Sequence, residues 1–315
     1  IIKQRVLDII RITSFLLVAT FFGLWLSVYL PLELELLLSF LLIGTFGILH
    51  GANDIGILTS YFQKRGANIP KTGMTMLYII MIASICAVFY FFPTIALMLF
   101  ILFSSYHFGE QHWNTTLTGN FKGKSLFYLL YGGLILFMLF HAHREQVVQI
   151  VLDITGRDVP TRVIGQLFLW MGIGVGLFFL YFAYARLRTY SILLELFLLA
   201  VFYVVFNTAS LLLAFCIYFV VWHSIPSLMD QMKFLYGEVS WKSFYRYFKS
   251  SYLYWLASLL GTLILYLLLR NTEETLVPGL ICFLASITVP HVLVMTKIEE
   301  YLKAHPETDV GSNAQ

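Results

Sequence analysis

Residues 94–113 read TIALMLFILFSSYHFGEQHW, an apolar run that ends in a histidine, a glutamate and a second histidine. Its length matches the roughly 20 residues that an α-helix needs to cross the hydrocarbon core of a bilayer. Ionisable side chains inside such a run are costly in lipid and usually mark a functional site. This one stretch therefore predicts a membrane-spanning helix that carries part of a site.

The composition of the whole chain supports a membrane protein. Of its 315 residues, 59% are hydrophobic and only 12% are charged, whereas soluble domains are about half apolar and a quarter charged. The net charge of +3 is small and the basic residues of the chain are scattered along it, so we expect no nucleic-acid partner. The three cysteines show no CxxC spacing, which argues against disulfides or a thiolate metal site.

Apolar runs long enough to span a bilayer predict an all-α, polytopic bundle that forms a single transmembrane domain over 1–315. We predict ten spans, at about 9–30, 33–61, 73–92, 94–113, 122–141, 162–185, 190–206, 208–232, 250–269 and 276–300. The connections alternate in charge: sixteen Lys and Arg residues fall in one set and four in the other. Because basic residues stay on the cytoplasmic side, both termini are predicted to be cytoplasmic.

Histidines are the most informative residues in these runs. Three of the eight, His141, His143 and His305, are predicted to be solvent-exposed in a loop and in the polar tail. Four others lie 17, 13, 15 and 15 residues after predicted span starts at 33, 94, 208 and 276, and are His50, His107, His223 and His291. These four spans run in the same direction, so the four imidazoles share one depth, about 20 to 26 Å from the outer ends at 1.5 Å per residue.

A shared depth favours one metal site over four separate hydrogen bonds across helix interfaces. Imidazole ligands suit iron, copper, zinc or nickel. Asp54 follows His50 by one helical turn, and Glu110 follows His107 by nearly one turn, so each carboxylate is predicted to accept the ring N–H of a liganding histidine. His112 is expected to lie too near its helix end to join the cluster.

Local irregularity is expected beside three of the histidines. Gly51, Gly109 and Pro290 are their chain neighbours or near neighbours, and glycine or proline at these places would let backbone or substrate approach. From the residues alone, the favoured function is a mononuclear metal enzyme acting on a lipid-soluble substrate. The alternative is a metal-ion or proton-coupled transporter with an intramembrane histidine site.

Four segments carry a resemblance to a known family. They are His50-Gly51-x-x-Asp54, Ser105-Tyr106-His107-Phe108-Gly109, Trp222-His223-Ser224 and Pro290-His291. In this order they resemble the Brp/Blh family of membrane β-carotene 15,15′-dioxygenases, which supply retinal to microbial rhodopsins. Some members of that family carry a second histidine one turn after the Trp-His pair, where this chain has Ser227, and this departure favours His291 as the fourth ligand.

The resemblance implies Fe(II)-dependent cleavage of the central double bond of β-carotene by dioxygen, giving two retinals. It also implies a multi-pass protein of the bacterial inner membrane, in contact with lipid and with a retinal-binding rhodopsin as a partner. The four histidines would be both the metal ligands and the catalytic residues. Residues adjacent to them are candidates for the wall of a substrate tunnel, and these are Tyr106, Phe108, Trp113 and Trp222.

Overall fold

The fold is seen in a computed structural model, which describes residues 2–67, 69–113, 117, 121–185, 192–269 and 273–304. His305 and its predicted exposure lie outside these residues. Helices make up almost all of this part of the chain, which contains no β-strand. The helices form two compact units, the first comprising Ile1–Gly47, Phe108–Glu145 and Thr161–Pro226 and the second Ile48–His107, Gln146–Pro160 and Ser227–Gln315.

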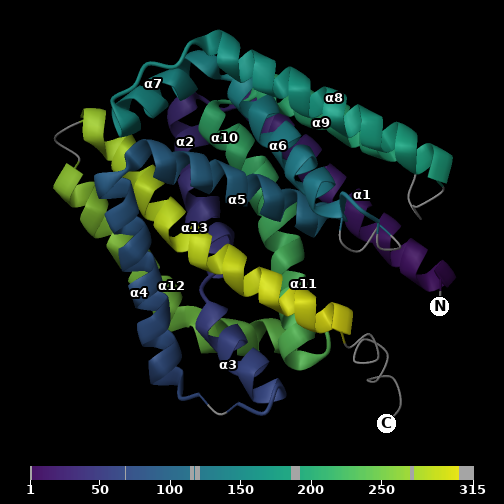
Figure 1. The fold of residues 1–315 in the computed structure, drawn as a ribbon, viewed down its shortest axis with the longest axis vertical. Helices are drawn as coiled ribbons and strands as arrows, with labels where there is room; N and C mark the ends of the chain where they lie inside the picture. The colour runs from purple at the N-terminus through teal and green to yellow at the C-terminus, as the bar shows by residue number, and fades with distance from the viewer. Residues whose placement is uncertain are drawn as a thin grey trace. The chain divides into compact units, whose positions relative to one another are not determined.

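The first unit is a bundle of long apolar helices. Its elements are α1 (Ile2–Tyr29), α2 (Leu32–Leu42), the π-helix η1 (Ile43–Gly47), α6 (Lys124–Ala142), α8 (Thr161–Ala185), α9 (Ile192–Thr208), α10 (Leu211–Cys216), the π-helix η2 (Ile217–Ser224) and the last turns of α5 (Pro93–Trp113). Helix α6 lies against α8 and α9 (Figure 1). The two π-helices contact each other, and π-helical turns often accompany functional sites.

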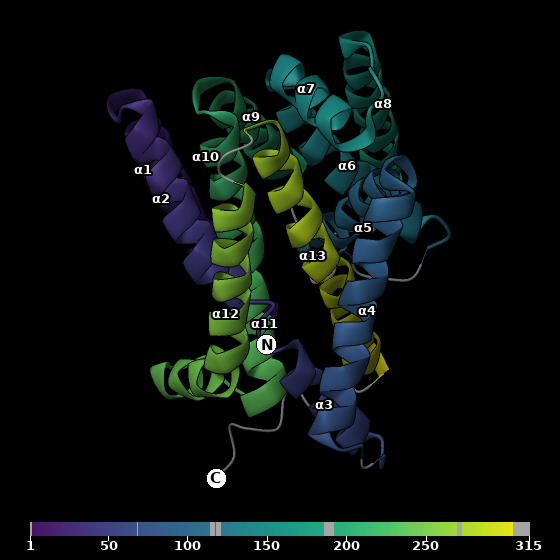
Figure 2. The ribbon, with the colours of Figure 1, turned by 90° about the vertical axis from the view of Figure 1, so that its left-hand side faces the viewer.

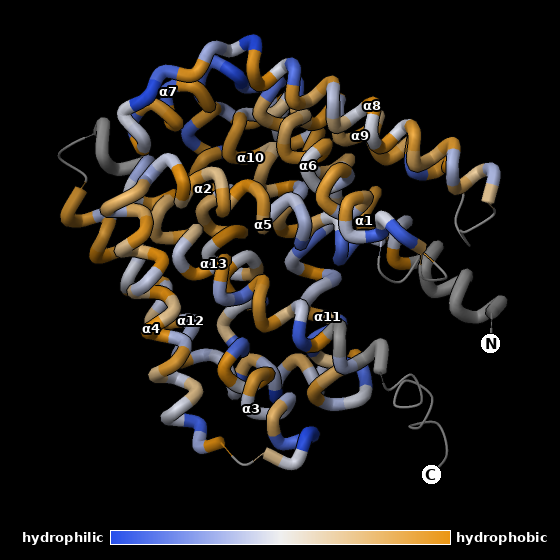
Figure 3. Tube along the Cα trace, in the orientation of Figure 1, coloured by the Kyte–Doolittle hydropathy of each residue, from blue (hydrophilic) through white to orange (hydrophobic). Residues whose placement is uncertain are grey.

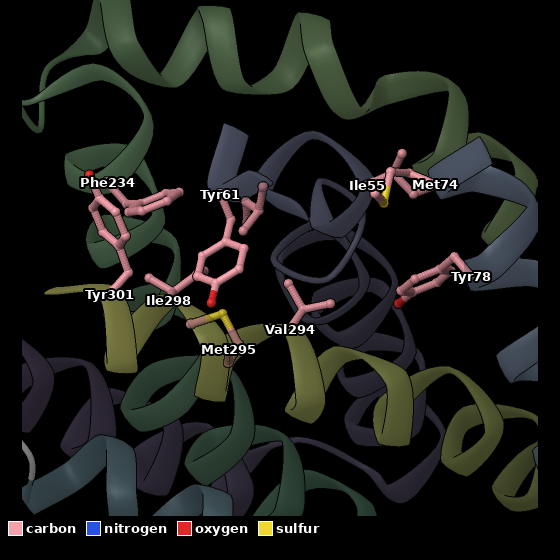
Figure 4. Packing of buried hydrophobic residues seen from close by; sticks show 10 residues of the cluster. Ile55, Tyr61, Met74, Tyr78, Phe234, Val294, Met295, Ile298 and Tyr301 are labelled. Atoms are coloured by element: carbon pink, nitrogen blue, oxygen red, sulfur yellow. The ribbon is translucent and has the colours of Figure 1, made fainter. Parts of the chain in front are cut away.

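The second unit is built around α13. Its elements are α3 (Asp54–Lys64), α4 (Lys71–Phe91), the first turns of α5, most of α7 (Arg144–Thr155) and α11 (Ile225–Tyr236), α12 (Trp241–Leu269) and α13 (Glu273–Ala304). Helix α13 packs on α4, α12 and α3, as the side view shows (Figure 2). A buried apolar cluster joins α3, α4, α11 and α13, and Figure 4 shows Tyr61, Met295 and Ile298 at its centre.

Seven helices among the described residues are long and apolar enough to cross a membrane: Ile12–Tyr29, Lys71–Phe91, Lys124–Ala142, Thr161–Ala185, Leu211–Tyr236, Trp241–Leu269 and Pro278–Ile298. Hydrophobic residues follow one another along α8, whereas hydrophilic residues gather around α7 (Figure 3). Helix α9 is apolar but shorter, and α5 ends in polar residues. The all-helical membrane class is therefore supported, with seven candidate spans where the sequence predicted ten.

One of the predicted spans is interrupted in the structure. The predicted span 33–61 is not continuous, because a turn at 50–53 separates η1 and the residues after it from α3. The predicted span 208–232 corresponds to one candidate span, Leu211–Tyr236, which consists of α10, η2 and α11. The predicted span 250–269 lies within α12, which begins at Trp241. The turn is polar at His50 and Asn53, but it is only four residues long and apolar runs flank it on both sides, so hydropathy averaged over the length of a span does not resolve it.

Candidate metal centre

Three histidines meet inside the second unit. His50 lies in the turn before α3, His107 in α5 and His291 in α13, and each is only 3–4% exposed. The ring centroid of His291 is 4.7 Å from that of His50 and 5.6 Å from that of His107. Both pairs meet edge to face, at 90° and 85°. The fold thus brings three imidazoles into one buried place, although His50 and His107 are 57 residues apart in sequence and His107 and His291 are 184 apart.

The His291 ring is held by a carboxylate. Its Nδ1 lies 2.9 and 3.1 Å from the two oxygens of Asp54, and the Tyr78 hydroxyl donates to Asp54 Oδ2 at 2.6 Å. An acceptor at this distance places the ring proton on Nδ1, so the lone pair of His291 is on Nε2. That Nε2 is buried and has no hydrogen-bond partner among the described residues.

This arrangement fits a metal ligand. A histidine that binds a metal through one nitrogen commonly donates its other N–H to a carboxylate, which fixes the tautomer and raises the basicity of the ring. A buried imidazole nitrogen without a partner otherwise carries a desolvation cost. The donor set of three neutral imidazoles suits a transition metal such as iron.

Asp54 therefore has a different partner from the one the spacing predicted. A spacing of one α-helical turn was expected to place this carboxylate beside the His50 ring. The break in the helix at residues 50–53 interrupts that geometry. The carboxylate bonds instead to His291, 237 residues away in sequence. Only the packing of α3 on α13 brings the two together.

The irregularities expected near the histidines differ among the three positions. At Gly51 the helix is broken, as expected. Helix α13 continues through Pro290 without a break. Helix α5 also continues through Gly109, but there the backbone of Tyr128 approaches so closely that a Cβ would collide with its carbonyl group.

His223 and Glu110 belong to the first unit. His223 is 3% exposed and lies in η2, where its ring stacks on Phe219 with centroids 5.4 Å apart and meets the edge of Phe108 at 4.8 Å. The Gln111 amide donates to the His223 carbonyl at 2.9 Å. Glu110 is also buried, at 3% exposed.

His112 belongs to a separate polar cluster in the first unit. Its Nε2 lies 3.0 Å from Glu195 Oε2, and the Tyr131 hydroxyl, which lies 3.2 Å from the same nitrogen, donates to that oxygen at 3.1 Å. Sequence reasoning missed Glu195, although a lone acid within the apolar run 190–206 is the kind of signal that marks a buried polar contact in a membrane.

The four tunnel candidates have different surroundings. Trp113 is fully buried and its ring contacts those of Phe127, Tyr131, Phe179 and Phe182 within the first unit. Its place in a tunnel wall stays a prediction.

Trp222 donates its indole N–H to Thr20 Oγ1 at 2.8 Å and meets the ring edge of Phe202. Phe108 is buried against Tyr218 and Phe219, and Tyr106 is half-buried. A tunnel wall formed by these residues stays a prediction.

The predicted exposure of His141 and His143 is wrong. Both are partly buried at the end of α6, where His141 stacks on Phe168 with ring centroids 5.3 Å apart. Burial lowers the pKa of His143 from its usual value near 6.5. The loop was expected to be solvated because it is polar, but neighbouring residues of the first unit partly bury both side chains.

Apolar helices of membrane-spanning length around a buried histidine cluster define an α-helical membrane protein with a candidate metal site. Residues 41–299 match the family model described as beta-carotene 15,15′-dioxygenase, and the chain belongs to that family. It is an enzyme, a β-carotene 15,15′-dioxygenase, and the resemblance carried by the four histidine segments is confirmed. No curated protein and no solved structure is similar enough to this chain to match it.

Proposed function

We propose that the enzyme uses Fe(II) and dioxygen to cleave the central 15,15′ double bond of all-trans-β-carotene into two retinals. The bond breaks and each new carbonyl group takes one oxygen atom of O₂, so the reaction balances without another reductant. The observation that carries the proposal is the buried Nε2 of His291, which lies beside two other imidazoles while Asp54 holds the opposite side of the ring.

His50, His107 and His291 would hold the iron, with His223 as the fourth ligand predicted from the sequence. These neutral imidazoles would leave the positive charge of a bound iron uncompensated, and the iron would supply the capacity to bind and activate dioxygen. The chain's own contribution is to orient the ligands. Asp54 keeps the Nδ1 proton of His291 in place, and Tyr78 keeps the carboxylate of Asp54 in place.

The surroundings of the site would exclude water and select the bond. All four histidines are 3–4% exposed, which suits a reaction between dioxygen and an apolar polyene. β-Carotene has no polar group for the protein to bind, so the position of cleavage must follow from the length and shape of an apolar passage. The predicted tunnel residues Tyr106, Phe108, Trp113 and Trp222 are proposed to shape this passage. Glu110 keeps the role predicted from its spacing, that of an acceptor for the ring N–H of a liganding histidine.

The proposed setting is the inner membrane of a bacterium. Ten spans with both termini in the cytoplasm accord with the sixteen-to-four distribution of basic residues. Lipid would deliver the substrate, and a retinal-binding rhodopsin would take up the product.

The first experiment is expression of the wild type in β-carotene-producing bacteria, with retinal quantified in pigment extracts and iron measured in the purified protein. We expect retinal and about one iron per chain, and we expect His291→Ala to lose both. The matched control is His143→Ala, which removes a partly buried imidazole outside the cluster and should keep both.

Two outcomes would contradict the proposal. Intact carotene with zinc or manganese in the wild type would argue for metal transport, whereas iron and full activity in His291→Ala would remove His291 from the ligand set.

A further inference from the structure

The turn that carries His50 departs from helical hydrogen bonding. In a continuous α-helix the amide of residue 54 donates to the carbonyl of residue 50. Here the Asp54 amide donates to the carbonyl of Gly51 at 3.3 Å, and the Ala52 amide donates to that of Leu49 at 3.1 Å. Backbone carbonyls buried at membrane depth need donors from within the protein.

A side chain from α12 supplies a donor at this turn. The hydroxyl oxygen of Tyr247 lies 3.0 Å from the carbonyl oxygen of His50 and 3.3 Å from that of Leu49. Tyr247 is fully buried, and the Ser250 hydroxyl, three residues further along α12, lies 3.2 Å from Asn53 Oδ1 in the same turn. Both contacts join residues nearly 200 positions apart in the chain.

Tyr247 is in turn fixed by α11. Its hydroxyl lies 2.6 Å from Gln231 Oε1, and Gln231 Nε2 lies 3.1 Å from Ser227 Oγ; Gln231 and Ser227 are fully buried. A tyrosine hydroxyl has one proton, but three acceptor oxygens surround this one. As placed, the hydroxyl proton is shared between Gln231 Oε1 and the His50 carbonyl, while Gln231 Nε2 donates to Ser227 Oγ and approaches Met295 Sδ. Turning the Gln231 amide by half a rotation would let Nε2 donate to Tyr247 and leave the hydroxyl proton to the His50 carbonyl.

We propose that Tyr247 is a positioning residue for the metal centre: its hydroxyl, oriented by Gln231 and Ser227, holds the backbone of His50 so that the His50 imidazole faces the ring of His291. A ligand in a four-residue turn has fewer backbone restraints than one inside a helix such as His291. The Tyr247 hydroxyl replaces the missing restraint. This inference rests on the proposed iron site.

The test compares the rate of iron release to an Fe(II) chelator from purified wild type and Tyr247→Phe, which lacks only the hydroxyl. We expect release about 10-fold faster in the variant, of the order seen when outer partners of metal ligands are removed. The Co(II)-loaded proteins should differ in their visible absorption, because that spectrum reports ligand geometry and not overall stability.

Two further variants make the test specific. Tyr254→Phe is the matched control, since its hydroxyl lies on the same helix and contacts Thr75 of α4 at 3.4 Å, away from the His50 turn; it should release iron at the wild-type rate. Gln231→Leu keeps the Tyr247 hydroxyl but removes its partner, and should speed release several-fold even if Tyr247→Phe fails to accumulate.

The outcomes separate this inference from the proposed function. Suppose that the wild type retains iron, and that Tyr247→Phe releases iron at the wild-type rate and has the wild-type Co(II) spectrum. This result would overturn the positioning role alone, and the same result for Gln231→Leu would do so if Tyr247→Phe fails to accumulate. Wild type that retains no iron would overturn the iron site and this role with it.

Discussion

The Asp54 carboxylate would act on the proposed metal through its contact with His291 Nδ1. It is 1% exposed and shares the Nδ1 proton of His291, while Tyr78 donates to its other side. A negative charge at this distance strengthens the imidazole as a ligand, and it partly compensates a cation bound by neutral histidines. The position of this one carboxylate therefore affects both the orientation of His291 and the charge of the site.

At the residue scale, Asp54→Asn should lower iron affinity about 10- to 100-fold, because the amide can still bond to His291 but carries no charge. Iron binding to purified protein, measured by competition with a chelator, gives the affinity. Asp153→Asn is the control, since Asp153 is exposed and bonds only within α7, to Gln149. Equal affinities in Asp54→Asn and wild type would refute this role.

Helix α5 contributes to both units, so its packing matters at the scale of elements. Gly109 lies in contact with the backbone of Tyr128 in α6, and any side chain there would overlap a carbonyl group that cannot rotate away. The absence of a side chain at residue 109 allows the end of α5 to lie directly on α6.

Gly109→Ala should accordingly yield little folded protein, because α5 and α6 would have to separate. Gly176→Ala in α8 is the matched control: nothing lies within 4 Å of its added methyl group, and alanine favours a helix by up to about 1 kcal/mol over glycine. Size-exclusion chromatography in detergent measures the folded fraction, and normal yields of Gly109→Ala would contradict the close packing.

The contact between α9 and α5 depends on a buried polar pair. Glu195→Leu should destabilise the protein by about 1–3 kcal/mol, because it leaves His112 and the Tyr131 hydroxyl without their shared acceptor. The double variant with His112→Leu should recover part of this loss, since both polar partners are then removed. Thermal unfolding in detergent gives the comparison, and a double variant less stable than the single one would exclude the pairing.

At the scale of the whole molecule, iron should stabilise the fold, because its three proposed ligands in the second unit come from α5, α13 and the turn before α3. A ligand present at 100 times its dissociation constant adds about 2.7 kcal/mol to the free energy of unfolding. The Tm should therefore rise by several degrees with Fe(II) and fall again with chelator. His291→Ala should show no such shift; the same shift in that variant would place iron elsewhere.

The sequence by itself indicated the membrane class and the helical content, and it singled out the histidines that are the candidate ligands. Hydropathy suffices for this because a helix in lipid must be apolar along its length, so each buried histidine stands out against its surroundings. The four motifs also sufficed for the family.

Tertiary structure alone decided which partners these residues have. Asp54 was assigned by spacing to His50 but bonds to His291, and Tyr247, Gln231 and Glu195 had no visible role. Spacing along one helix reports only neighbours within that helix, whereas these hydrogen bonds join different helices. Their geometry depends on a break at 50–53 that is too short for hydropathy averaged over a span to resolve, and on how α3, α12 and α13 pack around it.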